Sequence, residues 1–162
     1  MRMMNSGTKL SKNELKQATR SILRSLFKQA GCDIHEKAAG SVTYETVGIT
    51  GSDQRIAAIY GSRGGACALW VKDATWTRLK ENHDCRQMRV QDVSMFARGF
   101  QWAIHFDGPD DSWIAPVVAS TIIEGTKRWE KALDRRATEK RRSDDRERRE
   151  AKMAAKRKDP FA

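Results

Sequence analysis

The stretch SVTYETVGITGSDQRIAAIYGSRGGACALWVK, residues 41–72, decides the fold class. Three runs in it are typical of β-strands: 41–49 is rich in β-branched residues, and 55–60 and 66–72 are short and apolar. The connections between them, GSD and GSRGG, are short and contain residue types that favour tight turns. Because such short connections join antiparallel neighbours, the stretch predicts a three-stranded antiparallel meander.

A helix is predicted on each side of this meander. Before it, Ser11 and Glu14 have the spacing of a capping box, and apolar residues then recur at helical spacing over 15–30. After it, Pro116 suits the first turn of a longer helix, whose apolar residues keep to one side as far as Leu133.

The residues between the meander and the long helix predict four further elements. We expect a short helix over 74–82, capped by Asp73, a strand over 86–90, another short helix over 92–97 and a strand over 100–106. The expected fold is therefore α+β. A small, mainly antiparallel sheet, made of the meander and one or two more strands, is flanked by an N-terminal amphipathic helix and a long C-terminal helix.

Periodicity and composition divide the chain into three segments. Residues 1–10 show no periodicity and are expected to be disordered, 11–135 form the α+β domain, and 136–162 form a basic, charged tail that is helical or disordered. In the tail the apolar face disappears. Helicity there would rest on pairs of opposite charge four residues apart, each worth about 0.2–0.5 kcal/mol.

Charge is segregated along the 162 residues, whose net charge is +10. Residues 1–30 carry seven basic side chains and one acidic, 31–126 carry nine basic and twelve acidic, and 127–162 carry fifteen basic and eight acidic. A slightly acidic body thus lies between two basic ends, a pattern typical of arms and tails that bind polyanions. We expect a nucleic acid as the partner, DNA rather than RNA.

The candidate phosphate contacts lie in both basic ends. The first helix has a basic residue at every fourth position, which advances about 6 Å along the axis per step, and the tail has pairs and triplets of basic residues. A solvated helix face, a charged spacer or a protein partner for the C-terminal helix would account for the same pattern. The candidates are Lys12, Lys16, Arg20, Arg24 and Lys28 in the helix and Arg135, Arg136, Lys140, Arg141, Arg142, Arg148 and Arg149 in the tail.

No motif for metal or cofactor binding stands out. Cys32 and His35 with His83 and Cys85 offer four zinc ligands, but the second pair is closer in sequence than zinc sites use. A histidine and three aspartates over 105–111 offer ligands for Mg²⁺, and an aspartate-rich turn explains the same residues. We expect no metal and no cofactor.

Membrane and secretory locations do not fit the sequence. No apolar run approaches the roughly 20 residues of a membrane helix. The first ten residues, MRMMNSGTKL, lack the apolar segment and cleavage site of a secretory signal. The three cysteines fit a reducing compartment. We expect a cytoplasmic protein with no membrane partner.

One alternative function is enzymatic. The order of helix, three strands, helix and strand resembles the core of restriction-endonuclease-like nucleases, which implies metal-dependent cleavage. Asp53 and Lys72 fall near that family's acidic and lysine positions, but Trp70 stands where its second carboxylate belongs. The nuclease alternative would rest on Asp53, Lys72 and the acidic cluster over 107–111. No serine or cysteine has a recognisable nucleophile context.

The other alternative is a protein-interaction or inhibitor protein that uses its acidic middle or its tail. The reading favoured by the charge pattern is a non-catalytic accessory protein that binds DNA through phosphate contacts, of the kind a mobile element carries.

Overall fold

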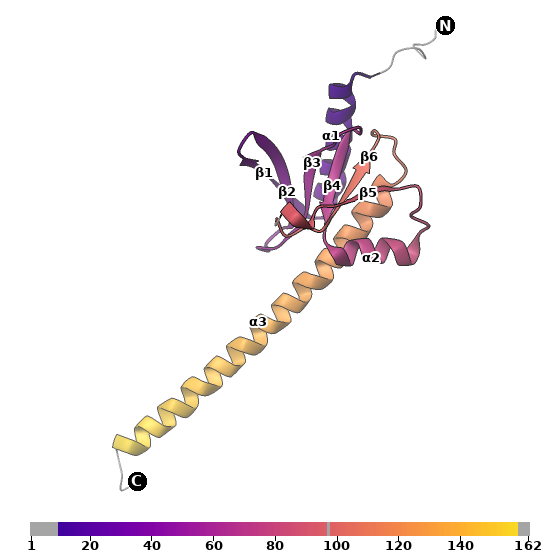
Figure 1. Cartoon of the computed structure of the whole chain (residues 1–162). Coiled ribbons are helices and arrows are strands. Elements are labelled where there is room, and N and C mark those ends of the chain that lie inside the picture. The colour runs from indigo at the N-terminus through magenta and orange to yellow at the C-terminus, as the bar shows by residue number, and fades with distance from the viewer. Residues whose placement is uncertain (1–9, 97, 159–162) are drawn as a thin grey trace. The chain divides into compact units, whose positions relative to one another are not determined.

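The computed structural model describes residues 10–96 and 98–158, and over these residues it shows three α-helices and one six-stranded sheet (Figure 1). In chain order the elements are α1 (Lys12–Gln29), β1 (Cys32–Ala39), β2 (Val42–Ile49), β3 (Arg55–Gly61), β4 (Cys67–Val71), α2 (Asp73–Asn82), β5 (Arg89–Asp92), a 3-10 turn (Ser94–Phe96), β6 (Trp102–Phe106) and α3 (Ile114–Lys158). The predicted α+β fold class is confirmed. The disorder expected for 1–10 concerns residues almost all outside the described part.

The sheet is antiparallel throughout, with strand order β1-β2-β3-β4-β6-β5. Its first four strands form a continuous meander, one strand longer than the sequence predicts. The additional strand is β1, which pairs with β2 along its whole length, from Cys32 opposite Ile49 to Ala39 opposite Val42. Most of β1 is exposed, so its sequence lacks the alternation that identifies a half-buried strand.

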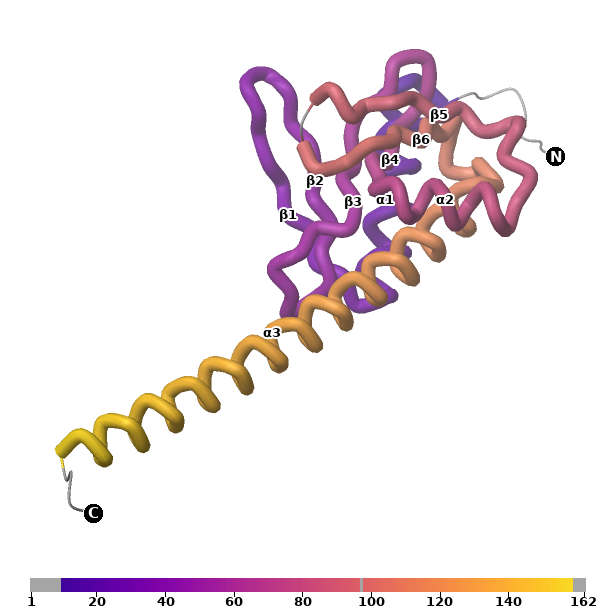
Figure 2. Tube along the Cα trace, turned by 60° about the horizontal axis from the view of Figure 1, so that its bottom comes forward, coloured from indigo at the N-terminus to yellow at the C-terminus, as the bar shows by residue number. Residues whose placement is uncertain are grey.

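All three helices share one core on one face of the sheet. Buried side chains of α1, α2 and α3 pack with strand residues that the register places on that face, such as Val47, Ile59 and Leu69. The helical contributors are Leu23 and Phe27 of α1, Leu79 of α2, and Ile114, Val117 and Val118 of α3. We call this the helix-covered face (Figures 1 and 2).

Stacked aromatic rings cross the opposite face of the sheet. The ring centroids of Tyr44 and Tyr60 are 4.6 Å apart, those of Tyr60 and Trp70 are 4.0 Å apart, and Phe96 lies 5.7 Å from Trp70. Phe100 is buried in the same cluster. The connection between β5 and β6, with its 3-10 turn, therefore packs against this face, which carries no α-helix from the described part of the chain.

The ends of the first two helices are fixed in different ways. In α1 the predicted capping box is confirmed: the backbone N–H of Glu14 donates to Ser11 Oγ at 3.2 Å, and that of Ser11 donates to Glu14 Oε1 at 3.2 Å. The cap predicted for α2 is wrong. The helix begins at Asp73 itself, so Lys72 is the N-cap, and it makes no side-chain cap bond. The Asp73 carboxylate accepts a hydrogen bond from Trp102 Nε1 at 2.8 Å.

The chain divides into two compact units, 1–126 and 127–162, and the boundary falls within α3. In the first unit α3 closely approaches β3, since a Cβ added to Gly125 would lie 2.5 Å from Cγ2 of Ile56. In the second unit the helix continues without interruption to Lys158, and from residue 139 onward every described side chain is exposed. Among the described helices, none combines the length and apolar character that crossing a membrane requires.

Candidate nucleic-acid interface

The five basic side chains predicted in α1 have different surroundings. Lys12 and Lys28, near its two ends, are exposed. Lys16 is half-buried beside the glycine-rich turn between β3 and β4, where its Nζ would lie 3.6 Å from a Cβ added to Gly61. The remaining two, Arg20 and Arg24, are partners of a buried carboxylate.

That carboxylate belongs to Glu45 of β2. Its Oε1 lies 3.2 Å from Nε of Arg20, and its Oε2 lies 3.2 Å from Nε of Arg24. The Glu45 side chain is only 9% exposed, against 27% for Arg20 and 44% for Arg24. Burying a carboxylate is costly unless cations compensate it, and the two arginines do so. Glu45 therefore neutralises one of the two arginine charges, and the net charge of the three side chains is +1.

Sequence reasoning missed Glu45, although a signal for it was present. The register places Glu45 opposite Ile59, on the helix-covered face. A single acidic residue at an inward position of a strand needs a cationic partner. Arg20 and Arg24, one turn apart in the first helix, were two such cationic partners.

The tail residues predicted as contacts all lie on the exposed part of α3. Three of them belong to a row of basic side chains that runs along the helix. A basic side chain occurs at every seventh position of the second unit. Each step advances about 10.5 Å along the axis and turns by only about 20° around it, so these side chains lie along one side of the helix. This basic stripe consists of Arg128, Arg135, Arg142, Arg149 and Lys156.

The other predicted tail residues lie off the basic stripe. Arg136 lies over the ring of Trp129, 5.2 Å from its centroid. Arg141 donates a hydrogen bond to Thr138 Oγ1 at 3.4 Å. Arg148 is 3.7 Å from the Asp145 carboxylate, a pair three residues apart rather than the four predicted. Lys140 is exposed. α1 and the basic stripe belong to different units of the chain and are two separate basic regions.

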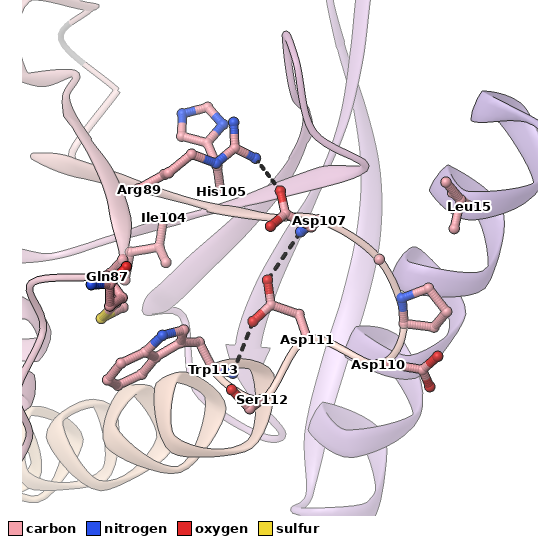
Figure 3. A pocket seen from close by; sticks show the side chains of 13 residues that line it. Leu15, Gln87, Arg89, Ile104, His105, Asp107, Asp110, Asp111, Ser112 and Trp113 are labelled. Carbon is pink, nitrogen blue, oxygen red and sulfur yellow. Dashed lines mark hydrogen bonds and ion pairs between the residues drawn. The ribbon is translucent and has the colours of Figure 1, made fainter.

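Two of the three carboxylates in the acidic turn after β6 have partners within the protein: one pairs with an arginine, and one accepts hydrogen bonds from the backbone of the turn. The turn lines a cavity of about 480 Å³ together with Arg89 and Trp113 (Figure 3). Asp107 accepts from Nη2 of Arg89 at 2.7 Å. The two oxygens of Asp111 accept from the backbone N–H groups of Asp107 at 3.0 Å and Trp113 at 2.9 Å. The turn interpretation thus accounts for Asp107 and Asp111, and Asp110 is exposed.

The possible metal ligands do not assemble. Over the described residues, no group of three or more His, Cys, Asp or Glu side chains is placed to hold a metal ion. Cys32 is buried on β1, and burial raises the pKa of its thiol, which disfavours the thiolate that a metal needs. His35 is exposed on the same strand, whereas His83 and Cys85 follow α2.

The residues of the nuclease alternative have structural contacts. Lys72 donates from Nζ to the carbonyl of Gly99 at 2.8 Å and lies 4.9 Å from the ring centroid of Phe100. It thereby fastens the β5–β6 connection to the sheet. Trp70 belongs to the stacked aromatic series, and Asp53 lies in the turn between β2 and β3.

Sequence reasoning also missed a chain of hydrogen bonds between three distant residues. Ser62 Oγ lies 2.6 Å from His105 Nδ1, and His105 Nε2 lies 3.2 Å from Gln91 Oε1. Ser62 follows β3, His105 is on β6 and Gln91 is on β5. No short motif signals this arrangement, because only the pairing of β6 with both β4 and β5 brings the three together.

A scan of protein-family models and searches of curated proteins and of solved structures found no match to this chain.

Proposed function

We propose that this protein binds nucleic acid, chiefly duplex DNA, through contacts between phosphates and the basic stripe of α3. The observation that carries the proposal is the regular row of basic side chains on a helix whose described residues are all exposed from 139 onward. Leu133, the last residue of its apolar face, is itself 45% exposed. A helix without an apolar face gains little from packing on a protein, whereas its charge suits a polyanion.

Duplex DNA fits this helix better than duplex RNA. The major groove of B-form DNA, about 12 Å wide, admits an α-helix. The major groove of A-form RNA is deep and narrow and excludes side chains. Contacts to phosphates carry no sequence information, and the proposed contacts are to phosphates, so we expect affinity with little sequence preference. Lys12 and Lys28, the exposed lysines of α1, supply a second region of contact.

A pair of charge-matched variants of the full chain tests this proposal. The stripe variant is Arg135→Gln, Arg142→Gln and Arg149→Gln. The control variant, Lys140→Gln, Arg141→Gln and Lys158→Gln, loses the same charge from other sides of the helix. Far-UV circular dichroism checks that both variants keep their helix content.

Binding to a labelled duplex is then titrated at several salt concentrations. The logarithm of affinity falls with the logarithm of salt by about 0.9 for each phosphate contact. Loss of three contacts should therefore make the slope less steep by about 2.7 in the stripe variant and by clearly less in the control. Equal changes in both variants would refute the role of the stripe. Absence of binding to duplex and single strands at low salt would refute nucleic-acid binding and favour a protein partner.

A further inference from the structure

We propose that Ser62 is a nucleophile activated by His105, in a groove that accepts phosphoric acid esters. This activity goes beyond nucleic-acid binding and does not depend on it. A catalytic serine needs a base within hydrogen-bond reach and a third group that orients the base. Ser62, His105 and Gln91 meet these conditions in their order and distances.

Hydrogen bonding sets the tautomer of His105. The amide oxygen of Gln91 can only accept, so the proton of the imidazole resides on Nε2. Nδ1 then presents its lone pair to Ser62 Oγ at 2.6 Å, and the hydroxyl donates to it. This is the arrangement in which a histidine can take the serine proton as general base.

The surroundings keep His105 neutral. Burial lowers the pKa of His105, and the positive charge of Arg89 lowers it further. The charged groups nearby are Arg89 on the neighbouring strand β5 and Asp107 at the end of β6, which pairs with Arg89. Since the free imidazole is the active form of a base, His105 is ready to accept a proton at neutral pH.

A glycine keeps the space beside Ser62 open. A Cβ added to Gly65 would lie 2.8 Å from Ser62 Oγ, 2.5 Å from Nη2 of Arg89 and 3.0 Å from the carbonyl oxygen of Phe106. A side chain there would displace the serine hydroxyl and the guanidinium together. The missing side chain lets Arg89 lie close to Ser62, where a cation can stabilise negative charge that develops in a transition state.

The groove on which Ser62 opens selects for anions. Its volume is about 640 Å³, and it lies between the first turns of α1 and the β3–β4 turn. Lys12, Lys16 and Arg63 line it together with Ser62. The one carboxylate on its lining, that of Asp107, is paired with Arg89. Three cations beside a serine favour a phosphate group over a neutral acyl group.

The reaction is a hydrolysis in two steps. Ser62 Oγ attacks phosphorus while His105 Nδ1 takes the hydroxyl proton, and the phosphorus–oxygen bond to the alcohol breaks as that oxygen receives the proton from His105. A water molecule, deprotonated by His105, then attacks the phosphoserine ester. The second product leaves as a phosphate, and Ser62 regains its proton.

A fluorophosphonate probe tests the activated serine directly. Ser62 Oγ would bond to the phosphorus of the probe and fluoride would leave, so mass spectrometry of the full-length protein should find one adduct on the peptide containing residue 62. Exposed Ser94 and Ser112 serve as internal controls and should stay unlabelled. Ser62→Ala should abolish the adduct, and an adduct spread over several serines, or none on Ser62, would overturn the proposal.

The role of His105 is tested through the labelling rate. His105→Gln should slow labelling by about 100-fold or more, the usual contribution of a general base. In the wild type the rate should fall as pH drops below the ordinary range of histidine. Gln91→Leu keeps His105 as the base but removes the hydrogen bond that orients its ring, so it should slow labelling by a smaller factor. This variant keeps the test decisive if His105→Gln fails to fold. If the labelling rate does not change with pH and is the same in both variants as in the wild type, activation by His105 is refuted.

The choice of phosphoric esters is tested by protection. Inorganic phosphate should slow labelling of the wild type but have little effect on Lys12→Gln/Lys16→Gln. A paired variant with the same charge loss elsewhere, Lys37→Gln/Lys80→Gln, should be protected like the wild type. Failure of phosphate to protect the wild type would overturn the substrate class. These measurements contain no DNA, so their failure is distinct from failure of nucleic-acid binding.

Discussion

Replacing Arg20 with glutamine should destabilise the protein, because the buried carboxylate of Glu45 would keep one cation instead of two. Removing one partner of a buried ion pair costs about 3–5 kcal/mol when the remaining charge is left uncompensated. Here Arg24 would still compensate part of the charge of Glu45. Arg20 is 27% exposed, so solvent screens part of the cost and leaves about 1–2 kcal/mol. For a chain of this length, 1 kcal/mol corresponds to about 2–4 °C, so the melting temperature should fall by roughly 2–8 °C. Arg24 is 44% exposed, and Arg24→Gln should therefore cost less.

Urea denaturation of a double-mutant cycle measures this interaction. The cycle compares Arg20→Gln, Glu45→Gln and the double variant with the wild type. We expect a coupling energy of about 1 kcal/mol, because residues that share an ion pair are not additive. A coupling energy near zero, or a larger cost for Arg24→Gln than for Arg20→Gln, would refute the reasoning that burial of Glu45 fixes both arginines.

Two further predictions concern packing and thiol exposure. Gly125→Ala adds about 1 kcal/mol of helix propensity, but its Cβ would lie 2.5 Å from Cγ2 of Ile56. Because overpacking costs about 1–3 kcal/mol, we expect lower stability on denaturant unfolding, and a more stable variant would contradict this close approach. Burial raises the thiol pKa of all three cysteines, but Cys85 is only half-buried whereas Cys32 and Cys67 are buried, so iodoacetamide should modify Cys85 first. Mass spectrometry showing Cys67 modified before unfolding would contradict this order.

Local patterns were sufficient for most of the fold. The capping box and apolar spacing of α1 and the glycine-rich turns of the meander identify their elements without reference to the rest of the chain. β1 was missed because its side chains are mostly exposed, so pairing with β2 holds it in place instead of burial. An edge strand of this kind leaves little hydrophobic pattern in the sequence.

The candidate sites depend more strongly on strand register. The basic residues of α1 and the tail can be located from sequence alone, but their partners cannot. Glu45 meets Arg20 and Arg24 because it lies on the face of the sheet that the helices cover. Ser62 and His105 meet only because β6 lies next to β4. One-residue shifts in register would move these side chains to the other face, and short motifs carry no information about such shifts.

The strand order β4-β6-β5 also constrains the sequence of events during folding. β5 precedes β6 in the chain, yet β6 is its partner in the sheet and separates it from β4. The meander β1-β2-β3-β4 can close through short turns as soon as it leaves the ribosome, whereas β5 is joined to it only through β6. The hydrogen bond between Ser62 and His105 joins the end of β3 to β6, and the bond from His105 to Gln91 joins β6 to β5. The first of these bonds therefore requires β6 to lie beside β4, and its formation would report that β6 has been added to the meander.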